Sequence, residues 1–276
     1  MVFLRANMDL SIIILNYKTR GLLKECLKGI KMVQPKLDYE IIVVDNASGD
    51  GTPAMMRENF PEIKFIASDK NLGYAKGNNL GIKAASGRYV MIMNPDIVVF
   101  LDALEQLVKF LDSHDDVGIV GPKLLNPDKS LQYSCYRFPD FWEPIYRRTP
   151  LGRLGFAKKK LDHYFMKDFD HNSTREVDWL LGGCLLIRRK SLDDVGLLDE
   201  RYFAYFDDVD LCRSMWEKKW KVVYFPEVSV IHFHRRESAE GHWWSGIFKK
   251  VTRIHLRSWI KYFRKWGTKE SEKLKV

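Results

Sequence analysis

The stretch EIIVVDNASGDGTP, residues 40–53, combines one buried strand, one turn and the start of one helix. Its apolar run ends on Asp45, and the Ser-Gly-Asp-Gly-Thr-Pro segment that follows predicts a turn, a helix cap and a helix-starting proline. Similar apolar runs occupy residues 10–15, 63–67 and 89–93. These runs are too apolar for half-exposed strands, so they indicate a parallel sheet that is covered on both faces.

Helical patterns separate these strands, at residues 21–33, 53–59, 74–85 and 102–112. We therefore expect an α/β fold with a central, mostly parallel sheet and helices on both faces. After residue 118 we expect strands at 118–125, 131–138, 221–225 and 228–233, a helix at 208–219, and an apolar segment at 178–188 that two glycines interrupt. Residues 139–175 are rich in Pro, Arg and Lys and show no clear period, which predicts a loop.

The composition is that of an ordinary globular chain. It has 276 residues, 46% hydrophobic and 29% charged, so we expect one large α/β domain or one domain with a small appendage. Its 45 basic and 36 acidic residues give a formal charge of +9, which favours a negatively charged partner such as a nucleic acid, an anionic membrane or a phosphorylated substrate.

The sequence also predicts the compartment. The four cysteines form no CxxC pair, which argues against a disulfide framework and against a zinc site built on cysteines. The first ten residues do not resemble a signal peptide, and no apolar run reaches the length of a membrane span. We therefore expect a cytoplasmic protein.

Polar residues follow three of the predicted strands at their carboxyl ends, where open parallel sheets bind ligands. These residues are Asn16-Tyr17, Asp45-Asn46-Ala47-Ser48 and Asn94-Pro95-Asp96. A carboxylate after a strand often only caps the next helix, but three polar strand ends in one sheet favour a binding site. The chain has no GxGxxG after its first strand and no GxxxxGK[ST], so we expect a metal ion on Asp96 to neutralise the phosphates of a bound nucleotide.

Two further clusters carry titratable side chains. Asp207, Asp208 and Asp210 lie within four positions beside aromatic residues. In a partly desolvated cleft one of these carboxyls should have a raised pKa, which suits a general base. Acids also favour a helix N-terminus, so Asp207 could cap a helix while Asp208 faces the cleft. His232 and His234 alternate along a strand, and either could add a metal ligand beside Asp96.

The C-terminal region, residues 241–276, is predicted to be a basic amphipathic helical extension. Seven Lys or Arg and no acid lie between residues 249 and 265, and apolar residues recur there at spacings near three and four. The sequence leaves two interpretations open: the apolar face packs on the domain, or the helix lies on an anionic membrane leaflet. His242-Trp243-Trp244 and the basic region 146–167 would add membrane or phosphate contacts.

Seven segments, in this order and spacing, resemble the inverting glycosyltransferase family 2, of GT-A fold, and particularly its rhamnosyltransferase-like branch. The segments are SIIILNY (11–17), VVDNASGDGT (43–52), NLGYAKGNN (71–79), MNPD (93–96), WLLGGCLLIRR (179–189), VGLLDE (195–200) and DDVDL (207–211). The resemblance implies a Rossmann-like nucleotide-diphospho-sugar transferase domain over residues 1–240. Its nucleotide-binding half would span 9–97 and its acceptor-binding half 98–240.

The resemblance also implies a role for each matching residue. The implied nucleotide-binding residues are Asn16, Tyr17, Asp45, Asn46, Ser48, Asn71, Gly73, Asn78 and Asn94, with Asp45 at the base or ribose. The implied acceptor-binding residues are Trp179, Gly182 and Gly183. Asp96, helped by His232, would hold Mg²⁺ or Mn²⁺ on the diphosphate. Asp208, with Asp207 beside it, would deprotonate an acceptor hydroxyl that attacks the anomeric carbon opposite the leaving nucleotide. The family usually has Glu where this chain has Asp207.

The resemblance implies transfer of L-rhamnose from dTDP-rhamnose onto a saccharide or lipid-linked saccharide in cell-surface polysaccharide synthesis. The alternatives are a UDP-sugar donor and a non-catalytic homologue, since Asn94-Pro95-Asp96 offers one carboxylate where a DXD motif offers two. A nucleic-acid-binding protein would also suit the positive charge, but no nucleic-acid-binding module is recognisable. We therefore expect a nucleotide-sugar and an acceptor as partners, and no nucleic acid. If its C-terminal helix binds lipid, the enzyme would be peripheral on the inner face of the cytoplasmic membrane.

Overall fold

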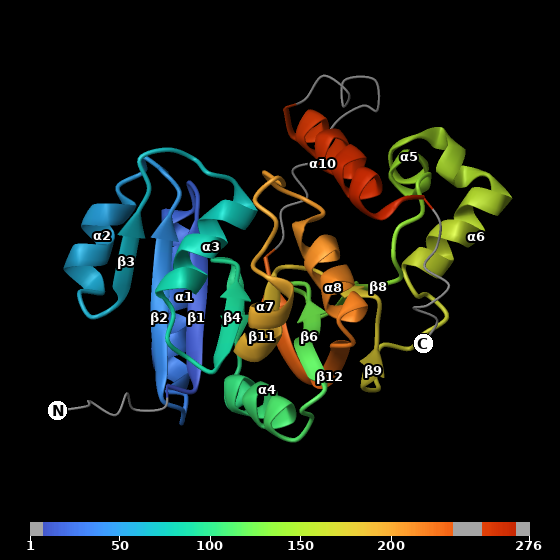
Figure 1. Ribbon diagram of the computed structural model, residues 1–276. Coiled ribbons are helices and arrows are strands. Elements are labelled where there is room, and N and C mark those ends of the chain that lie inside the picture. Colours follow the sequence, from blue (N-terminus) through green and yellow to red (C-terminus); the bar gives the residue numbers. More distant parts are fainter. Residues whose placement is uncertain (1–7, 234–249, 269–276) are drawn as a thin grey trace.

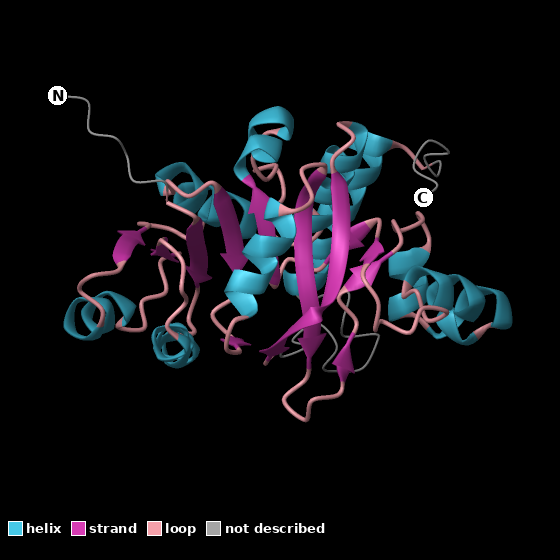
Figure 2. Cartoon of the chain, turned by 90° about the horizontal axis from the view of Figure 1, so that it is seen from below, coloured by secondary structure: helices cyan, strands magenta, loops and turns pink. Residues whose placement is uncertain are grey.

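The computed structural model describes residues 8–233 and 250–268, which form a mixed sheet with helices on both faces (Figures 1 and 2). The strands of the main sheet are β1 (Leu10–Asn16), β2 (Tyr39–Asp45), β3 (Lys64–Ala67), β4 (Tyr89–Met93), β5 (Ile97–Val99), β6 (Val117–Leu125), β7 (Leu131–Gln132), β9 (Arg175–Glu176), β11 (Cys184–Arg188) and β12 (Lys221–His232). Two short strands, β8 (Cys135–Tyr136) and β10 (Trp179–Leu180), pair separately. The helices are α1 (Arg20–Val33), α2 (Thr52–Asn59), α3 (Tyr74–Ala84), α4 (Ala103–Asp112), α5 (Glu143–Arg148), α6 (Gly155–Tyr164), α7 (Arg189–Val195), α8 (Asp207–Glu217) and α10 (Lys250–Trp266), with a 3₁₀ turn η1 (Pro150–Arg153).

The main sheet confirms the predicted, mostly parallel α/β architecture. Its strand order is β3-β2-β1-β4-β11-β6-β12-β5, with β7 beside β6 and β9 beside β12. The strands β3, β2, β1 and β4 are parallel neighbours, and β6 is parallel to β12. The strand β11 interrupts this run, because it is antiparallel to both β4 and β6, and β5 at the end of the order is antiparallel to β12. The register pairs Asn16 with Asp45, so the polar residues that end β1 and β2 lie side by side.

Alternate residues of β1 are buried on opposite faces of the sheet, which explains why its sequence is apolar at every position. Ile12 and Ile14 belong to the core cluster that includes residues of α1, α2 and α4, whereas Ile13 belongs to the cluster that includes residues of α3, α7 and α8. All three side chains are fully buried. Each contributes about 1.5–3 kcal/mol relative to an exposed position.

Two expectations for the second half of the chain are wrong. Residues 139–175 are not a loop, because they form α5, η1 and α6. Pro144, Pro150 and Gly152 interrupt the apolar spacing there, so each helical piece is too short to show a period. The strands predicted on either side of Pro226 are one strand, β12, whose pairing with β6 shifts between Phe225 and Ser229. The proline therefore lies where the ladder is irregular.

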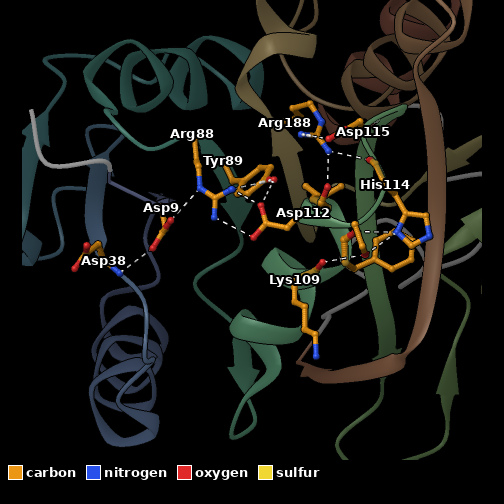
Figure 3. A network of polar contacts seen from close by, with 12 residues as sticks. Asp9, Asp38, Arg88, Tyr89, Lys109, Asp112, His114, Asp115 and Arg188 are labelled. Atoms are coloured by element: carbon orange, nitrogen blue, oxygen red, sulfur yellow. Dashed lines mark hydrogen bonds and ion pairs between the residues drawn. The ribbon is translucent and has the colours of Figure 1, made fainter.

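The amino ends of β1 and β4 are joined by a network of ion pairs (Figure 3). The Arg88 side chain donates to Asp9 Oδ1 at 2.9 Å and to Asp112 Oδ2 at 3.0 Å. Tyr89 Oη donates to Asp112 Oδ1 at 2.7 Å. The nearby Arg188 donates to three backbone carbonyls at the end of α4 and the start of β6. This network fixes the amino-terminal ends of these strands, opposite the carboxyl ends that carry the predicted site.

The last described helix, α10, lies beside α8 and the start of α5 (Figure 1). Tyr262 and Phe263 are buried, Arg213 Nη1 of α8 donates to Tyr262 Oη at 3.1 Å, and the ring of Phe141 lies 4.4 Å from that of Trp259. Thus the apolar face of this helix packs on the domain. None of the helices within residues 8–233 and 250–268 has the length and hydropathy needed to cross a membrane.

Candidate active site

A buried polar network ends β1 and β2. Asp45 Oδ1 accepts hydrogen bonds from Asn16 Nδ2 at 2.8 Å and from Ser48 Oγ at 2.5 Å, and Asn16 Nδ2 also donates to Thr52 Oγ1 at 3.1 Å. Asn16, Asp45 and Ser48 are all at most 4% exposed. The structure thus brings these three predicted residues together. Asp45 uses its carboxylate to hold the turn between β2 and α2, a role that the strand-end pattern alone did not predict.

A second network joins the end of β2 to the loop before α3. Asn46 Nδ2 donates to Asn71 Oδ1 at 3.0 Å and to the Gly73 carbonyl at 3.2 Å, and Asn46 Oδ1 accepts from the Leu72 N–H at 2.8 Å. Gly73 has a φ of +83°, and a Cβ there would lie 2.3 Å from the Phe203 carbonyl oxygen. Only glycine fits this position, because any side chain would strain the backbone and clash with the residues before α8.

Three predicted nucleotide-binding residues lie outside these buried networks: Tyr17, Asn78 and Asn94, the last of which lies beside His232. The ring of Tyr17 is 44% exposed, and the nearby side chains of Asn71 and Lys18 lower its pKa. Asn78 is fully buried on α3, where its Nδ2 donates to the Tyr74 carbonyl at 3.1 Å. Tyr17 therefore offers a surface to a ligand, whereas Asn78 interacts within its own helix.

The pairing of β5 with β12 brings Asp96 and His232 together, as predicted. His232 Nε2 lies 3.4 Å from Asp96 Oδ1 and 3.4 Å from Asn94 Nδ2. On the other side of the ring, Nδ1 lies 2.7 Å from Gln132 Oε1, an acceptor, so Nδ1 carries a proton and donates it. That tautomer turns the Nε2 lone pair towards Asp96 when the ring is neutral. Gln132 was not predicted, and His234 lies outside the described residues.

The dipeptide Gly182-Gly183 connects the acid cluster to this Asp–His pair. The Gly182 N–H donates to Asp208 Oδ2 at 3.0 Å, and Asp208 Oδ1 accepts from the Val209 N–H at 2.9 Å. A Cβ on Gly182 would lie 3.4 Å from Asp208 Oδ2, and one on Gly183 would lie 3.2 Å from His232 Cε1. The catalytic candidate and the metal-binding candidates therefore flank one dipeptide, although 24 positions separate Asp208 from His232 in the sequence.

The expected raised pKa is found for two adjacent carboxyls. Burial raises the pKa of Asp208, and the two backbone N–H donors lower it only in part. Burial, followed by the charge of Asp208, raises the pKa of Asp207 well above its usual value. The expectation that Asp207 caps the helix is wrong. Tyr205 and Phe206 have φ values of +67° and +64°, so the chain turns sharply into α8, and Phe206 occupies the cap position without a side-chain hydrogen bond.

Tyr74 is a central residue of the site that sequence reasoning missed. Its Oη donates to the Gly182 carbonyl at 2.5 Å and lies 3.4 Å from Asn94 Oδ1. Burial, and then the charges of Asp207 and Asp208, raise its pKa well above the usual value, so it stays a neutral donor. Its position in the NLGYAKGNN segment was a sequence signal for a role in the site. Nothing in that segment indicates its partner, Gly182, which is 108 residues away.

Trp179, predicted to contact an acceptor, is only 6% exposed. Its ring stacks on Tyr136 with centroids 4.4 Å apart, and its Nε1 donates to the Arg137 carbonyl at 2.9 Å. A ring packed in this way offers almost no surface to a ligand. Trp179 instead supports the backbone that leads to Gly182.

Asp210, the third acid of the cluster, faces α10 and not the dipeptide. Its carboxylate is 2% exposed and accepts hydrogen bonds from Trp266 Nε1 at 2.7 Å, Lys265 Nζ at 2.7 Å and Tyr202 Oη at 3.1 Å. Since α8 also carries Asp208, these bonds tie the C-terminal helix to the helix of the candidate base.

Comparisons with known proteins show which sequences and folds this chain resembles. Residues 11–196 match the model of the family described as glycosyl transferase family 2. The N-acetylglucosaminyl-diphospho-decaprenol L-rhamnosyltransferase of Mycobacterium tuberculosis is 30% identical over 217 residues, which cover 72% of this chain and 67% of that protein. The rhamnosyltransferase WbbL of Escherichia coli is 25% identical over 259 residues, which cover 91% of each chain.

Two solved structures share the fold. One is the mannosyltransferase PcManGT from Pyrobaculum calidifontis in complex with GDP-Man and Mn²⁺, with a TM-score of 0.61 and 21% identity over 94% of this chain and 65% of that chain. The other is GalNAc-T7 with UDP, GalNAc and Mn²⁺, with a TM-score of 0.61 and 14% identity over 85% of this chain and 44% of that chain. This chain thus spans less than two thirds of either solved chain, and at these identities the likeness concerns the fold.

Proposed function

Because this chain belongs to glycosyl transferase family 2, we propose that it transfers L-rhamnose from dTDP-rhamnose to a lipid-linked saccharide, with inversion at the anomeric carbon. Its place in the family makes it a glycosyltransferase, and its fold is GT-A. Relatives at 25% and 30% identity are named as rhamnosyltransferases, which supports rhamnose as the sugar. The name of one of them includes a diphospho-decaprenol, which supports a lipid-linked acceptor. The observation that carries the proposal is the placement of Asp208 and of the Asp96–His232 pair on either side of Gly182-Gly183.

In the proposed reaction Asp208 is the general base. It takes the proton of the acceptor hydroxyl while that oxygen forms a bond to the anomeric carbon. The bond from this carbon to the diphosphate oxygen breaks on the opposite face, and the nucleotide leaves with the electron pair. A carboxylate whose pKa is raised by burial is a stronger base than an exposed one, and general bases of this kind contribute about 10²–10⁴ in rate. Asp207 beside it has its pKa raised further, by burial and by the charge of Asp208, so of the two carboxyls Asp207 holds a proton more readily and Asp208 is left to act as the base.

Asp96 and His232 fit a divalent cation, Mg²⁺ or Mn²⁺. A carboxylate oxygen and an imidazole lone pair face each other at 3.4 Å, and Gln132 fixes the ring in the tautomer that a metal requires. Among residues 8–233 and 250–268 no third His, Cys, Asp or Glu completes a protein-only site. The remaining positions would therefore fall to diphosphate oxygens and water. A bound cation would supply charge neutralisation as the diphosphate leaves.

The proposed nucleotide site lies at the ends of β1 and β2. Tyr17 provides an exposed ring for the base, and the Asn16–Asp45–Ser48 network holds the turn that approaches the base or ribose. Asn46, Asn71 and Gly73 fix the loop that closes over the nucleotide, with Asn78 buried in the following helix and Asn94 beside the diphosphate. Gly182 and Gly183 would leave room for the acceptor. Residues 9–97 would then be the nucleotide-binding half and residues 98–240 the acceptor-binding half.

The proposal is tested with the full chain, Mn²⁺, a synthetic N-acetylglucosaminyl-diphospho-lipid and a donor panel of dTDP-rhamnose, UDP-sugars and GDP-mannose. We expect a mass increase of one deoxyhexose with dTDP-rhamnose, and the inverted anomeric configuration in the NMR spectrum of the product. Turnover only with a UDP-sugar would overturn the donor assignment. Absence of turnover with every donor, together with no nucleotide binding, would favour a non-catalytic homologue.

The metal assignment has its own control. Asp96→Asn should remove the dependence of dTDP affinity on Mn²⁺, measured by titration calorimetry, while dTDP affinity without metal stays unchanged. Equal Mn²⁺ dependence in the variant and the wild type would show that Asp96 is not a ligand.

A further inference from the structure

The segment 143–164 forms a projecting pair of helices at the side of the molecule, next to α10 (Figure 1). It comprises α5, η1 and α6, and its turns are closed by backbone hydrogen bonds, among them Leu154 N–H to the Leu151 carbonyl at 3.1 Å and Lys158 N–H to the Leu154 carbonyl at 2.8 Å. The Tyr146 and Phe156 rings, 6.0 Å apart, join its two helices. The segment is therefore an ordered element of the domain.

Three large apolar side chains are exposed within six positions of this segment. Leu151 is 49% exposed, Leu154 46% and Phe156 60%. Single exposed apolar residues are ordinary, but a cluster on a projecting turn marks a surface that contacts another phase or molecule.

The charge around these side chains is mainly positive. Residues 143–164 contain six Lys or Arg and two acids, Glu143 and Asp162, which pair with Arg147 and Lys167. Two of the six are already paired, Arg147 with Glu143 at 3.1 Å and Lys160 with Asp140 at 3.0 Å. Arg153, Lys158 and Lys159 are exposed, and no acid within the described parts of the chain forms an ion pair with them. We call Leu151, Arg153, Leu154, Phe156, Lys158 and Lys159 the tip surface.

We propose that the tip surface inserts its apolar side chains into an anionic membrane leaflet while its lysines and arginine contact lipid phosphates. Exposed Leu and Phe beside unpaired basic residues match the two parts of a leaflet, its acyl boundary and its negative headgroups. The amphipathic helix α10 supplies mainly charge, because its apolar face is packed against α8 and Phe141 and Ile260 is its one exposed large apolar side chain among residues 250–266. Most of the apolar contact therefore comes from α5, η1 and α6.

The base of the same segment lies close to the active site. The rings of Tyr164, which ends α6, and Trp179 lie 6.3 Å apart, and three positions after Trp179 the chain reaches Gly182, which binds Asp208. A membrane-bound tip would thus hold the acceptor side of the site near the leaflet. The membrane contact rests on the proposed transfer to a lipid-linked acceptor, and it adds the surface by which the enzyme would reach that acceptor.

The experiment measures cosedimentation of the full chain with vesicles of phosphatidylcholine alone and of equal parts phosphatidylcholine and phosphatidylglycerol. We expect binding only to the anionic vesicles, and weaker binding at high salt. Lys158→Glu/Lys159→Glu should weaken partitioning at least about 30-fold, since each lysine near such a leaflet contributes about fivefold. Leu151→Ser/Leu154→Ser should weaken it about tenfold by removing apolar contact, and it leaves the ring contact of Tyr146 with Phe156 in place.

Matched variants control for general changes of charge and surface. Lys218→Glu/Lys219→Glu reverses two adjacent exposed lysines at the end of α8, and Met32→Ser/Leu101→Ser removes two exposed apolar side chains elsewhere. Both should bind vesicles as the wild type does. All four variants should keep the wild-type melting temperature, because every changed side chain is exposed.

Several results would overturn the proposal. The proposal is wrong if the wild type fails to bind anionic vesicles, or if the tip variants bind as the wild type does. It is also wrong if Arg257→Glu/Arg264→Glu on α10 abolishes binding while the tip variants keep it. A tip variant that dissociates a dimer in size-exclusion chromatography, without any vesicle binding by the wild type, would assign the surface to a second copy instead. Vesicle binding without sugar transfer would refute only the proposed function. Transfer to a water-soluble acceptor by a chain that binds no vesicles would refute only the membrane contact.

Discussion

Replacing Asp210 with alanine tests whether the C-terminal helix is held to the helix of the candidate base through one carboxylate. Asp210 is buried and accepts hydrogen bonds from Trp266 Nε1, Lys265 Nζ and Tyr202 Oη at 2.7, 2.7 and 3.1 Å. The Lys265 side chain is 26% exposed, so its ammonium can turn to water, whereas the indole and phenol donors stay in the protein. Hydrogen bonds to charged groups contribute about 1.5–3 kcal/mol each, so the loss of two should lower the free energy of unfolding by about 3 kcal/mol.

Thermal unfolding measures this effect directly. In a chain of this size about 3 kcal/mol corresponds to a fall in melting temperature of roughly 5 °C. Trp266→Phe, which removes one donor to this carboxylate, should cost about 1.5 kcal/mol. The matched control is Asp162→Ala, which removes a partly exposed carboxylate paired with Lys167 and should change stability by less than about 0.5 kcal/mol.

The reasoning fails if Asp210→Ala and Asp162→Ala lower the melting temperature equally. It fails in another way if the double variant Asp210→Ala/Trp266→Phe loses the full sum of the two single losses. Partners in one hydrogen-bond network should couple and give less than additive effects.

Two further predictions concern the site and the opposite edge of the sheet. Tyr74→Phe removes the hydroxyl that donates to the Gly182 carbonyl at 2.5 Å. Because one hydrogen bond contributes about 1 kcal/mol, we expect kcat to fall about fivefold with little change in KM. An unchanged kcat in steady-state kinetics would refute this. The hydrogen bond from Arg88 holds the pKa of Asp112 below its usual 3.8, so this carboxylate stabilises the fold above pH 3.8 and the contribution is lost as the pH falls through the lowered value. Asp112→Asn should therefore melt below the wild type at neutral pH and together with it in strong acid, and a gap that persists there would contradict the assignment.

The polar strand ends could be predicted because they depend on local sequence. An apolar run that ends on Asp45 and is followed by SGDGTP specifies strand, turn and helix within fourteen residues. Parallel pairing then places Asn16 beside Asp45 without further information. The resemblance of DDVDL to a known motif identified Asp208 for the same reason, since the motif is contiguous.

Contacts between distant segments could not be predicted in this way. The position of Tyr74 depends on a bond to Gly182, and that of His232 on a bond to Gln132, 100 positions earlier. No single-sequence pattern reports such pairs. Residues 144–161 were missed as helices for a different reason: their pieces are shorter than the spacing that reveals a helical period, and packing between them supplies the stability that propensity does not.

The most direct test of the proposed mechanism is the turnover of Asp208→Asn with the donor and acceptor that the wild type uses. Asparagine keeps the shape of the side chain and one acceptor for the N–H groups of Gly182 and Val209, but it cannot take a proton at the acceptor hydroxyl. We predict a fall in kcat of about 10²–10⁴, with dTDP affinity in the presence of Mn²⁺ within about twofold of the wild type. A variant that turns over at the wild-type rate would contradict the assignment of Asp208 as the base.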